Sequence, residues 1–372
     1  MTRRTIESPL FSPARIGALT VPNRFVRSAT HDFLAEEDGS GSDRNGALYA
    51  RLAEGEVGLI ITGHAYVSPE GKASPRQIGA SSDAHLPGLT RLVREVHAFQ
   101  SRIVLQIAHA GRQTKDKICG CVPLAPSAVI EPVMKVIPRE MTQSDIELAV
   151  RHFVQAAERA AQAGFDGVQL HAAHGYLLSS FFSPHSNRRT DDWGGSTENR
   201  ARLAVDILRG IKKACGPDFP VLIKMNSSDF LPGGLEVEEC VVLSRILARE
   251  GIDAIEVSGG TSEARKGSMW PGVRTEDEEG YFLPAAARVK AAVPVPVLGL
   301  GGFRTLRVME RALAEGQADL ISLSRPFVRE PFLVKKFRTG EIDRSACISC
   351  NKCLNPRGLS CAELKTGAAG EP

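Results

Sequence analysis

Short apolar runs alternate with helical patterns eight times along this 372-residue chain. Because apolar residues fill both faces of each run, the runs are typical of strands in a parallel sheet covered by helices. The predicted strands are Arg24–Ser28, Val57–Thr62, Ile103–Ala108, Gly167–His171, Val221–Met225, Ala254–Ser258, Val295–Leu300 and Leu320–Ser324. The predicted helices carry apolar residues at helical spacing and are Asp43–Glu54, Leu86–Gln100, Ser144–Ala163, Thr197–Ala214, Val237–Glu250, Leu283–Ala292, Thr305–Glu315 and Pro331–Thr339.

Eight strand–helix units predict one closed (β/α)8 TIM barrel of the α/β class. The rival fold is an open doubly wound sheet, which would carry a G-x-G-x-x-G turn after an early strand. The sequence has no such turn, and the later Pro232-Gly233-Gly234 is interpreted as a loop without that spacing. We therefore assign residues 1–340 to a single barrel and residues 341–372 to a short cysteine-rich tail.

The charge balance and hydropathy exclude two classes of partner. Lys and Arg number 46 against 43 Asp and Glu, so the net charge is +3, which is too weak a field for a nucleic-acid-binding protein. No apolar run reaches the roughly 18 residues of a membrane helix. The N-terminus, Met1 to Arg4, is basic, but no apolar segment of a signal peptide follows it. We expect a cytoplasmic protein that binds neither nucleic acid nor membrane.

Four of the eight cysteines gather in the tail, as Cys347, Cys350, Cys353 and Cys361. In a chain without a secretory signal, a disulfide framework is not expected. The spacing C-x2-C-x2-C-x7-C lets thiolates converge on one metal centre, and its first three positions match iron–sulfur ligation better than the paired knuckles of zinc sites. An iron–sulfur cluster, structural zinc and free thiols all remain open, whereas Cys119 and Cys121 are interpreted as ordinary thiols.

The densest polar motif is His171-Ala-Ala-His174-Gly175-Tyr176, at the end of the fourth predicted strand. In a barrel the chemistry lies where strands end and the following loops begin. Two histidines three positions apart can present two N–H donors to one oxygen, and Tyr176 adds a proton donor. The motif is therefore the candidate catalytic centre.

A longer signature follows this motif. It reads N-x-R-x-D-x-x-G-G-S-x-E-N-R from Asn187 to Arg200. Three further motifs occur elsewhere in the sequence, namely Pro22-Asn23-Arg24, the segment from Gln106 to Arg112, and Ser324-Arg325-Pro326. With these residues the sequence resembles the old yellow enzyme family of FMN-dependent oxidoreductases over most of its length. Together with the cysteine tail, it most resembles the barrel domains of dienoyl-CoA reductase and trimethylamine dehydrogenase.

The resemblance implies that residues 1–340 bind FMN at the strand ends. Gln106 would contact the pyrimidine edge with its amide donor and acceptor. Lys224 stands where the family usually has Arg, so it keeps a positive charge near N1 and C2=O of the flavin. The phosphate would lie on Gly301, Gly302, Ser324 and Arg325. The first loop and the wall beside it would contribute Ser28, Ala29, Thr30, His31, Gly63 and His64.

The resemblance also implies an NAD(P)H-dependent ene-reductase acting on small enone or enoyl compounds. A nicotinamide donor would reduce FMN and leave, and the alkene would enter the same site. His171 and His174 would hold the carbonyl oxygen, and hydride from flavin N5 would reach Cβ. Tyr176 would protonate Cα.

Relatives with a similar tail carry a [4Fe–4S] cluster, which implies such a cluster on Cys347, Cys350, Cys353 and Cys361. The fourth cysteine comes earlier here than in those relatives. Because the sequence ends at Pro372, their further domains are expected to be absent, so a cluster would need an electron-transfer protein partner. Two alternatives are an iron–sulfur flavoprotein dehydrogenase of the amine or dienoyl-CoA type, and an electron-carrier subunit with FMN and a cluster. We also expect a homo-oligomer.

Overall fold

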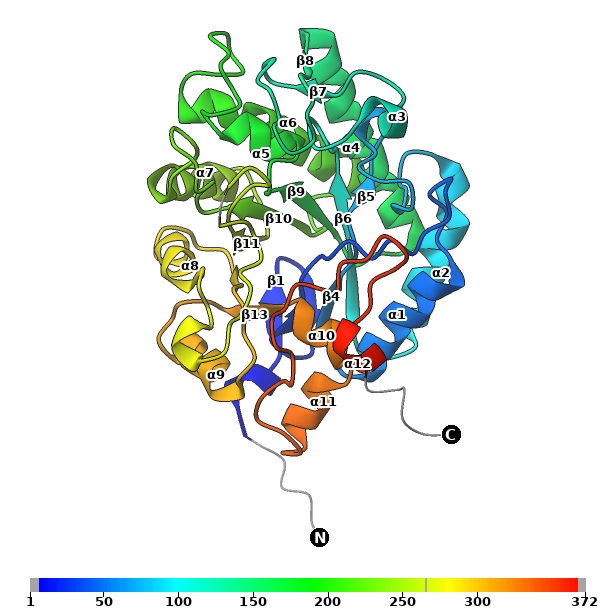
Figure 1. Ribbon diagram of the computed structural model, residues 1–372, viewed down its shortest axis with the longest axis vertical. Coiled ribbons are helices and arrows are strands. Elements are labelled where there is room, and N and C mark those ends of the chain that lie inside the picture. Colours follow the sequence, from blue (N-terminus) through cyan, green and yellow to red (C-terminus); the bar gives the residue numbers. More distant parts are fainter. Residues whose placement is uncertain (1–6, 265, 367–372) are drawn as a thin grey trace.

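The computed structural model describes residues 7–264 and 266–366, so Met1 to Arg4 and the end of the tail lie outside it. Within these residues eight parallel strands form a closed barrel surrounded by helices (Figure 1). β3 pairs with β13 and β4, and β4 pairs with β6, which closes the ring. The strands are β3 (Phe25–Arg27), β4 (Leu59–Ile61), β6 (Arg102–Ala108), β9 (Val168–Ala172), β10 (Val221–Asn226), β11 (Ala254–Ser258), β12 (Val297–Gly299) and β13 (Leu320–Leu323).

The predicted helices are found around the barrel, each with ends within a few residues of the expected ones. Capping explains the boundaries of the longest helix, because Thr142 accepts a hydrogen bond from the Asp145 N–H at its start and Gly164 ends it at φ 89°. The helices are α1 (Asp43–Glu54), α2 (Leu86–His97), α4 (Gln143–Ala163), α6 (Thr197–Cys215), α7 (Val237–Arg249), α8 (Leu283–Lys290), α9 (Leu306–Ala314) and α11 (Leu333–Arg338). The (β/α)8 prediction is confirmed.

Several short elements fall outside the eight-fold repeat and were not predicted. The hairpin of β1 (Ala14–Ile16) and β2 (Leu19–Val21) packs Ile16 and Val21 against Val26 and Leu59, so it covers one end of the barrel. The other short elements are β5 (Ala65–Tyr66), β7 (Leu124–Ala125), β8 (Arg139–Glu140), α3 (Asp116–Cys119), α5 (Leu177–Phe182), α10 (Arg325–Arg329), α12 (Ala362–Thr366), and the 3-10 turns Pro9–Phe11, Pro69–Gly71, Asp83–His85 and Glu276–Glu278.

The interior of the barrel changes from apolar to polar along the strands. Val104 and Leu222 belong to the apolar cluster that the hairpin covers. Further along the strands, Gln106 lies beside Gln169, and Lys224 lies between His171 and Glu256 in register. These polar side chains are buried. Because the strands are parallel, the polar layer lies at their carboxyl ends, where barrels place their active sites.

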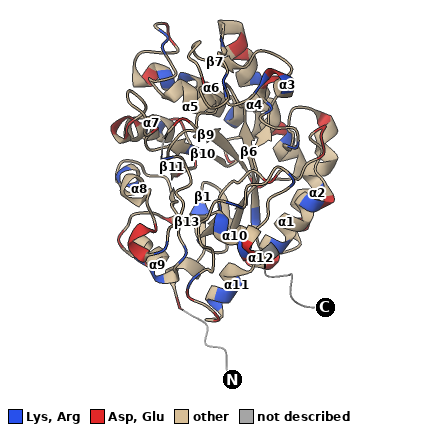
Figure 2. Cartoon of the chain, viewed as in Figure 1, with Lys and Arg blue, Asp and Glu red and all other residues tan. Residues whose placement is uncertain are grey.

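Charged residues of both signs are distributed over the surrounding helices (Figure 2). In the described part of the chain, no helix is both long and apolar enough to cross a lipid bilayer.

Candidate active site

A cavity of about 460 Å³ opens at the carboxyl ends of the barrel strands. It collects side chains that lie far apart in the sequence. All of the predicted catalytic and cofactor residues line it except Gly63 and Gly301. Those on its wall are Ser28, Ala29, Thr30, His31, His64, Gln106, His171, His174, Tyr176, Lys224, Gly302, Ser324 and Arg325.

The two glycines off the wall shape the chain behind it. The Gly63 N–H donates to the Tyr49 hydroxyl at 2.8 Å. The Gly301 carbonyl accepts from the N–H of Gly280 and of Tyr281, and a Cβ on Gly301 would lie only 2.7 Å from the Tyr281 nitrogen. Only glycine fits so close a backbone approach, which holds Gly302 against the cavity.

The histidine–tyrosine motif forms a compact group on one wall. The backbone of His174 adopts φ 62° and Gly175 adopts φ 83°, so the chain reverses sharply between His171 and Tyr176. The His171 ring lies edge-on to the His174 ring, with centroids 5.3 Å apart, and 4.4 Å from the Tyr176 ring. The His174 Nε2 lies 2.8 Å from the Ser258 Oγ.

Burial sets the protonation state of this group. Desolvation lowers the pKa of His171 and of His174 well below the ordinary value, and the nearby Lys224 acts in the same direction. Burial raises the pKa of Tyr176 to about 12. At neutral pH the wall therefore presents two neutral imidazoles and a phenol that keeps its proton.

A chain of buried polar contacts lies under the cavity. The Lys224 Nζ donates to the Ser28 Oγ at 2.8 Å and lies 3.7 Å from the Glu256 Oε1. The Gln106 Nε2 donates to the Gln169 Oε1 at 2.7 Å, and the Gln169 Nε2 donates to the Glu256 Oε2 at 2.9 Å. Sequence reasoning missed Gln169 and Glu256, although their polar side chains within apolar strands were a usable signal.

The far end of the cavity meets the tail. The Arg325 Nη1 donates to the Trp270 carbonyl at 2.8 Å and to the Asn351 Oδ1 at 2.6 Å. Leu354 of the tail lines the cavity. The sequence analysis did not predict Asn351 or Leu354 as part of the site. It also missed three residues that line the cavity, Gln113, Thr261 and Ser262.

Several buried polar atoms at the site lack a partner within the described chain, namely the His171 Nδ1, the Thr261 Oγ1 and the Ser322 Oγ, all on residues that line the cavity. Buried polar groups are nearly always hydrogen-bonded. Together with the charged and amide groups on the wall, these atoms fit a polar ligand with donors and acceptors along one edge.

The four tail cysteines line a second, small cavity together with Arg325 and Arg329. The Arg329 Nη1 lies 3.7 Å from the Cys361 Sγ. Among the described residues, no group of three or more His, Cys, Asp or Glu side chains is placed to hold a metal ion. The eight cysteines are all free thiols. Outside the tail, desolvation raises the pKa of Cys121 to about 11.

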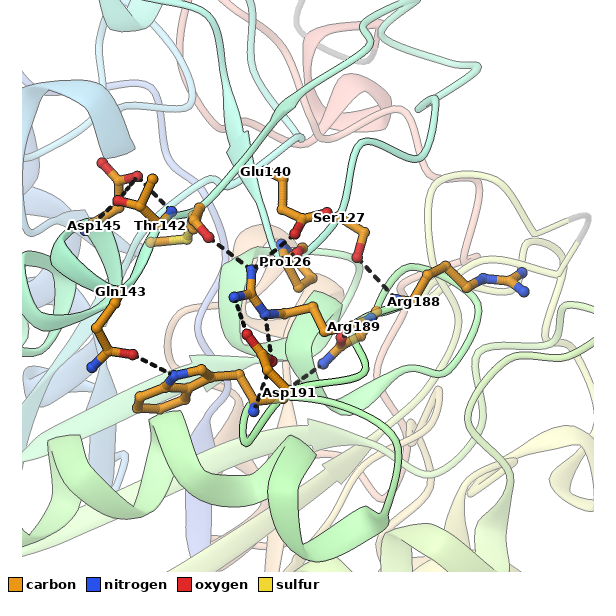
Figure 3. A network of polar contacts seen from close by, with 12 residues as sticks. Pro126, Ser127, Glu140, Thr142, Gln143, Asp145, Arg188, Arg189 and Asp191 are labelled. Atoms are coloured by element: carbon orange, nitrogen blue, oxygen red, sulfur yellow. Dashed lines mark hydrogen bonds and ion pairs between the residues drawn. The ribbon is translucent and has the colours of Figure 1, made fainter.

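The run from Asn187 to Arg200, which follows the motif, has a structural role (Figure 3). The Arg189 Nη1 donates to the carbonyls of Met141 at 2.7 Å and Pro126 at 3.2 Å, and its guanidinium pairs with Asp191. The Trp193 Nε1 donates to the Gln143 Oε1 at 2.7 Å. This run is therefore held against the long loop after β6 and against the start of α4.

The family described as "NADH:flavin oxidoreductase / NADH oxidase family" matches residues 9–343. The chain belongs to this family. It is 39% identical to an NADH oxidase from Thermoanaerobacter brockii over 352 residues, which are 94% of this chain and 54% of that protein. It is 35% identical to an NADPH dehydrogenase from Geobacillus sp. (strain WCH70) over 328 residues, which are 88% of this chain and 93% of that protein.

Solved structures similar to this chain include a reductase and an old yellow enzyme homologue. A complex of 2-naphthoyl-CoA reductase with 2-naphthoyl-CoA matches with a TM-score of 0.87 and 31% identity, over 93% of this chain and 54% of the other. An old yellow enzyme homologue from Zymomonas mobilis matches with a TM-score of 0.80 and 25% identity, over 95% and 97% of the two chains. The chain spans about half the length of the NADH oxidase and of the naphthoyl-CoA reductase. The predicted resemblance is confirmed, and the matches support an FMN-dependent NAD(P)H oxidoreductase.

Proposed function

We propose that this flavin oxidoreductase reduces the C=C bond of α,β-unsaturated carbonyl compounds, with FMN as cofactor and NADH or NADPH as electron donor. The observation that carries the proposal is the grouping of Tyr176 with His171 and His174 on one wall of the cavity. Relatives named NADH oxidase and NADPH dehydrogenase support a nicotinamide donor. A structural relative named 2-naphthoyl-CoA reductase supports an unsaturated acyl substrate.

The residues under the cavity fit FMN, which when bound supplies a hydride at N5. Because the Gln106 Nε2 already donates to Gln169, the Gln106 Oε1 and the second amide hydrogen are left for the pyrimidine edge. Lys224 would stabilise negative charge at that edge. Burial lowers the pKa of Lys224, and the nearby Glu256 carboxylate acts against that shift and favours the charged ammonium. The rim formed by Gly302, Ser324 and Arg325 would hold the phosphate.

The two histidines would hold the substrate carbonyl. Each neutral imidazole carries one N–H, so the pair can donate two hydrogen bonds to one oxygen. These bonds strengthen as negative charge develops on the oxygen, which favours the enolate over the ground state. The Ser258 hydroxyl, 2.8 Å from the His174 Nε2, helps to orient the His174 ring.

Tyr176 would give its proton to the substrate Cα. Its pKa of about 12 keeps the phenol protonated at neutral pH, and its ring lies against His171, close to where the carbonyl would bind. The chemistry then divides between residues, because the histidines bind oxygen and the tyrosine delivers the proton.

The two half-reactions test this assignment separately. Protein loaded with FMN is reduced anaerobically with NADH or NADPH, and flavin absorbance is followed after 2-cyclohexen-1-one is added. The proposal predicts reoxidation by the enone, and Tyr176→Phe should slow this half about 10²-fold or more while leaving reduction by the nicotinamide unchanged. Equal slowing of both halves would contradict the proton-donor role.

We also propose that the tail binds a [4Fe–4S] cluster. Support comes from the four thiols that line one small cavity, beside an arginine shared with the main cavity. The spacing C-x2-C-x2-C of the first three cysteines favours a cluster over zinc. Arg325 and Arg329 would offset negative charge on a thiolate-bound cluster.

A second candidate function follows from such a cluster, that of an iron–sulfur flavoprotein whose electrons pass through the tail to or from a protein partner. Iron and sulfide are measured on anaerobically purified protein, with Cys350→Ser as the test variant and Cys215→Ser, away from the tail, as the matched control. Iron at about four atoms per chain, lost in Cys350→Ser alone, is expected. Zinc, or no metal in either protein, would refute the cluster.

A further inference from the structure

The His64 ring connects the candidate acid to a buried glutamine. His64 lies beyond the end of β4 and is 6% exposed, and Gln77 in the following loop is completely buried. The His64 Nδ1 lies 2.6 Å from the Gln77 Nε2, and the His64 Nε2 lies 3.2 Å from the Tyr176 Oη. The direction of these two hydrogen bonds decides what His64 does for Tyr176.

Two backbone groups fix the orientation of the Gln77 amide. The Ala73 N–H donates to the Gln77 Oε1 at 2.6 Å, and the His64 carbonyl accepts from the Gln77 Nε2 at 3.1 Å. A backbone N–H can only donate and a carbonyl can only accept, so the amide cannot be flipped. The Gln77 Nε2 must therefore donate to the His64 Nδ1 as well.

This contact fixes the tautomer of His64. A ring nitrogen that accepts a hydrogen bond carries no proton, and burial lowers the His64 pKa well below its ordinary value, so the ring is neutral. Its single proton therefore lies on Nε2, which faces Tyr176. The neighbouring His31 ring does not compete, because its own Nε2 bonds the Ser74 Oγ at 2.6 Å.

We propose that His64, held in one tautomer by Gln77, donates a hydrogen bond to the Tyr176 oxygen and is a positioning residue for the proton-transfer step. The bond occupies one lone pair of the phenol oxygen and leaves its proton free to point at the substrate. This inference rests on the proposed function and adds to it a role for the ring of His64, which the resemblance implied only as part of the wall of the FMN site.

The step balances with the hydride that reduced FMN would supply and one proton that water returns to Tyr176. Hydride addition at Cβ brings two electrons to the alkene, and the negative charge moves to the carbonyl oxygen held by the histidines. The O–H bond of Tyr176 breaks, and its proton forms the new C–H bond at Cα. The phenolate that remains accepts the hydrogen bond from His64 until water returns a proton. His64 thus stabilises the charged form of the acid.

Substitutions at His64 test the kinetic consequence. In His64→Leu, enone-driven reoxidation of reduced flavin should slow about 10- to 100-fold, since a hydrogen bond to a charged group is lost, and it should slow far more than reduction by the nicotinamide does. His64→Gln places an amide donor near the Nε2 position and should recover most of the rate. Gln77→Met should slow the same half less, with the exposed Gln155→Met on α4 as the matched control.

A second measurement reads the tautomer without turnover. Nitrogen NMR of ¹⁵N-histidine-labelled holoprotein should show His64, identified by its loss in His64→Leu, as the neutral form with hydrogen on Nε2. Its Nε2 signal should move in Tyr176→Phe. A proton on Nδ1, unchanged reoxidation in His64→Leu, or equal slowing of both half-reactions would overturn the inference. If the enone fails to reoxidise wild-type protein, the proposed function fails, and the NMR result still decides whether His64 donates to Tyr176.

Discussion

Lys224 and Glu256 form a buried ion pair under the cavity, with the lysine Nζ 3.7 Å from the glutamate Oε1. Glu256 is completely buried and Lys224 is 3% exposed. The glutamate receives a hydrogen bond from Gln169, and the lysine donates one to Ser28. The lysine places a positive charge at the floor of the candidate FMN site, and the glutamate carboxylate partly neutralises that charge.

Breaking this pair from one side should be costly. Glu256→Gln leaves a buried ammonium without its counter-charge, so we expect a loss of about 3–5 kcal/mol in the free energy of unfolding. The double variant Lys224→Met/Glu256→Gln should recover part of that loss. Urea unfolding of Glu256→Gln, Lys224→Met and the double variant measures the coupling, and additive losses would mean that the two charges do not interact.

His174→Ala should weaken the binding of phenols, which stack on flavin as mimics of an enolate. The variant removes one of two N–H donors to the ligand oxygen, so affinity should fall about tenfold or more. The long-wavelength absorbance of the phenol–flavin complex gives the dissociation constant. Unchanged binding would remove His174 from the oxyanion-binding role.

Arg325→Met should weaken FMN binding about 10- to 100-fold, because a positive charge at the edge of the cavity is lost. Arg329→Met is the matched control, since Arg329 lines the cysteine cavity but not the main one. Quenching of FMN fluorescence on binding to apoprotein reports the affinity. Equal effects of the two variants would argue against a phosphate contact at Arg325.

The protein should lose stability as the pH falls below 6.5. His109 is 2% exposed, and its Nδ1 accepts from the Gly111 N–H at 3.0 Å. Burial lowers its pKa to about 4. The unfolded chain takes up a proton near pH 6.5 and the folded chain only near pH 4, so this residue costs about 2 kcal/mol at pH 5 relative to pH 8.

His109→Asn isolates that contribution, because its side-chain oxygen can still accept from Gly111. Denaturant unfolding of wild type and variant at pH 8 and pH 5 gives the comparison. The variant should lose less stability between the two pH values. An identical pH dependence would show that His109 is not held neutral in the fold.

The fold follows from local signals in the sequence. The eight apolar runs and the helical spacing predict the barrel, and glycine caps such as Gly164 mark helix ends. The β1–β2 hairpin was missed because its strands have three residues each, too few to show a period. The expected location, homo-oligomer and protein partner stay predictions.

The site was predictable only where residues stand in motifs. His171 lies at the end of β9, and His174 and Tyr176 follow within five residues, so the sequence itself brings the three together. Gln77 acts through tertiary contacts and lies in no recognisable pattern. Glu256 stands out as a polar residue within an apolar strand, but its partners Lys224 and Gln169 come from other strands. The same holds for the ring of His64, whose partners come from other segments, Gln77 and Tyr176.

The most direct test of the account follows where hydrogen atoms go during reduction of 2-cyclohexen-1-one. With nicotinamide deuterated at C4, product analysis by mass spectrometry and NMR should place deuterium at Cβ. In deuterated water with ordinary donor, it should appear at Cα, and Tyr176→Phe should slow product formation. Reduction of FMN by the nicotinamide without any saturated ketone, or deuterium from the donor at Cα, would contradict ene-reduction by this site.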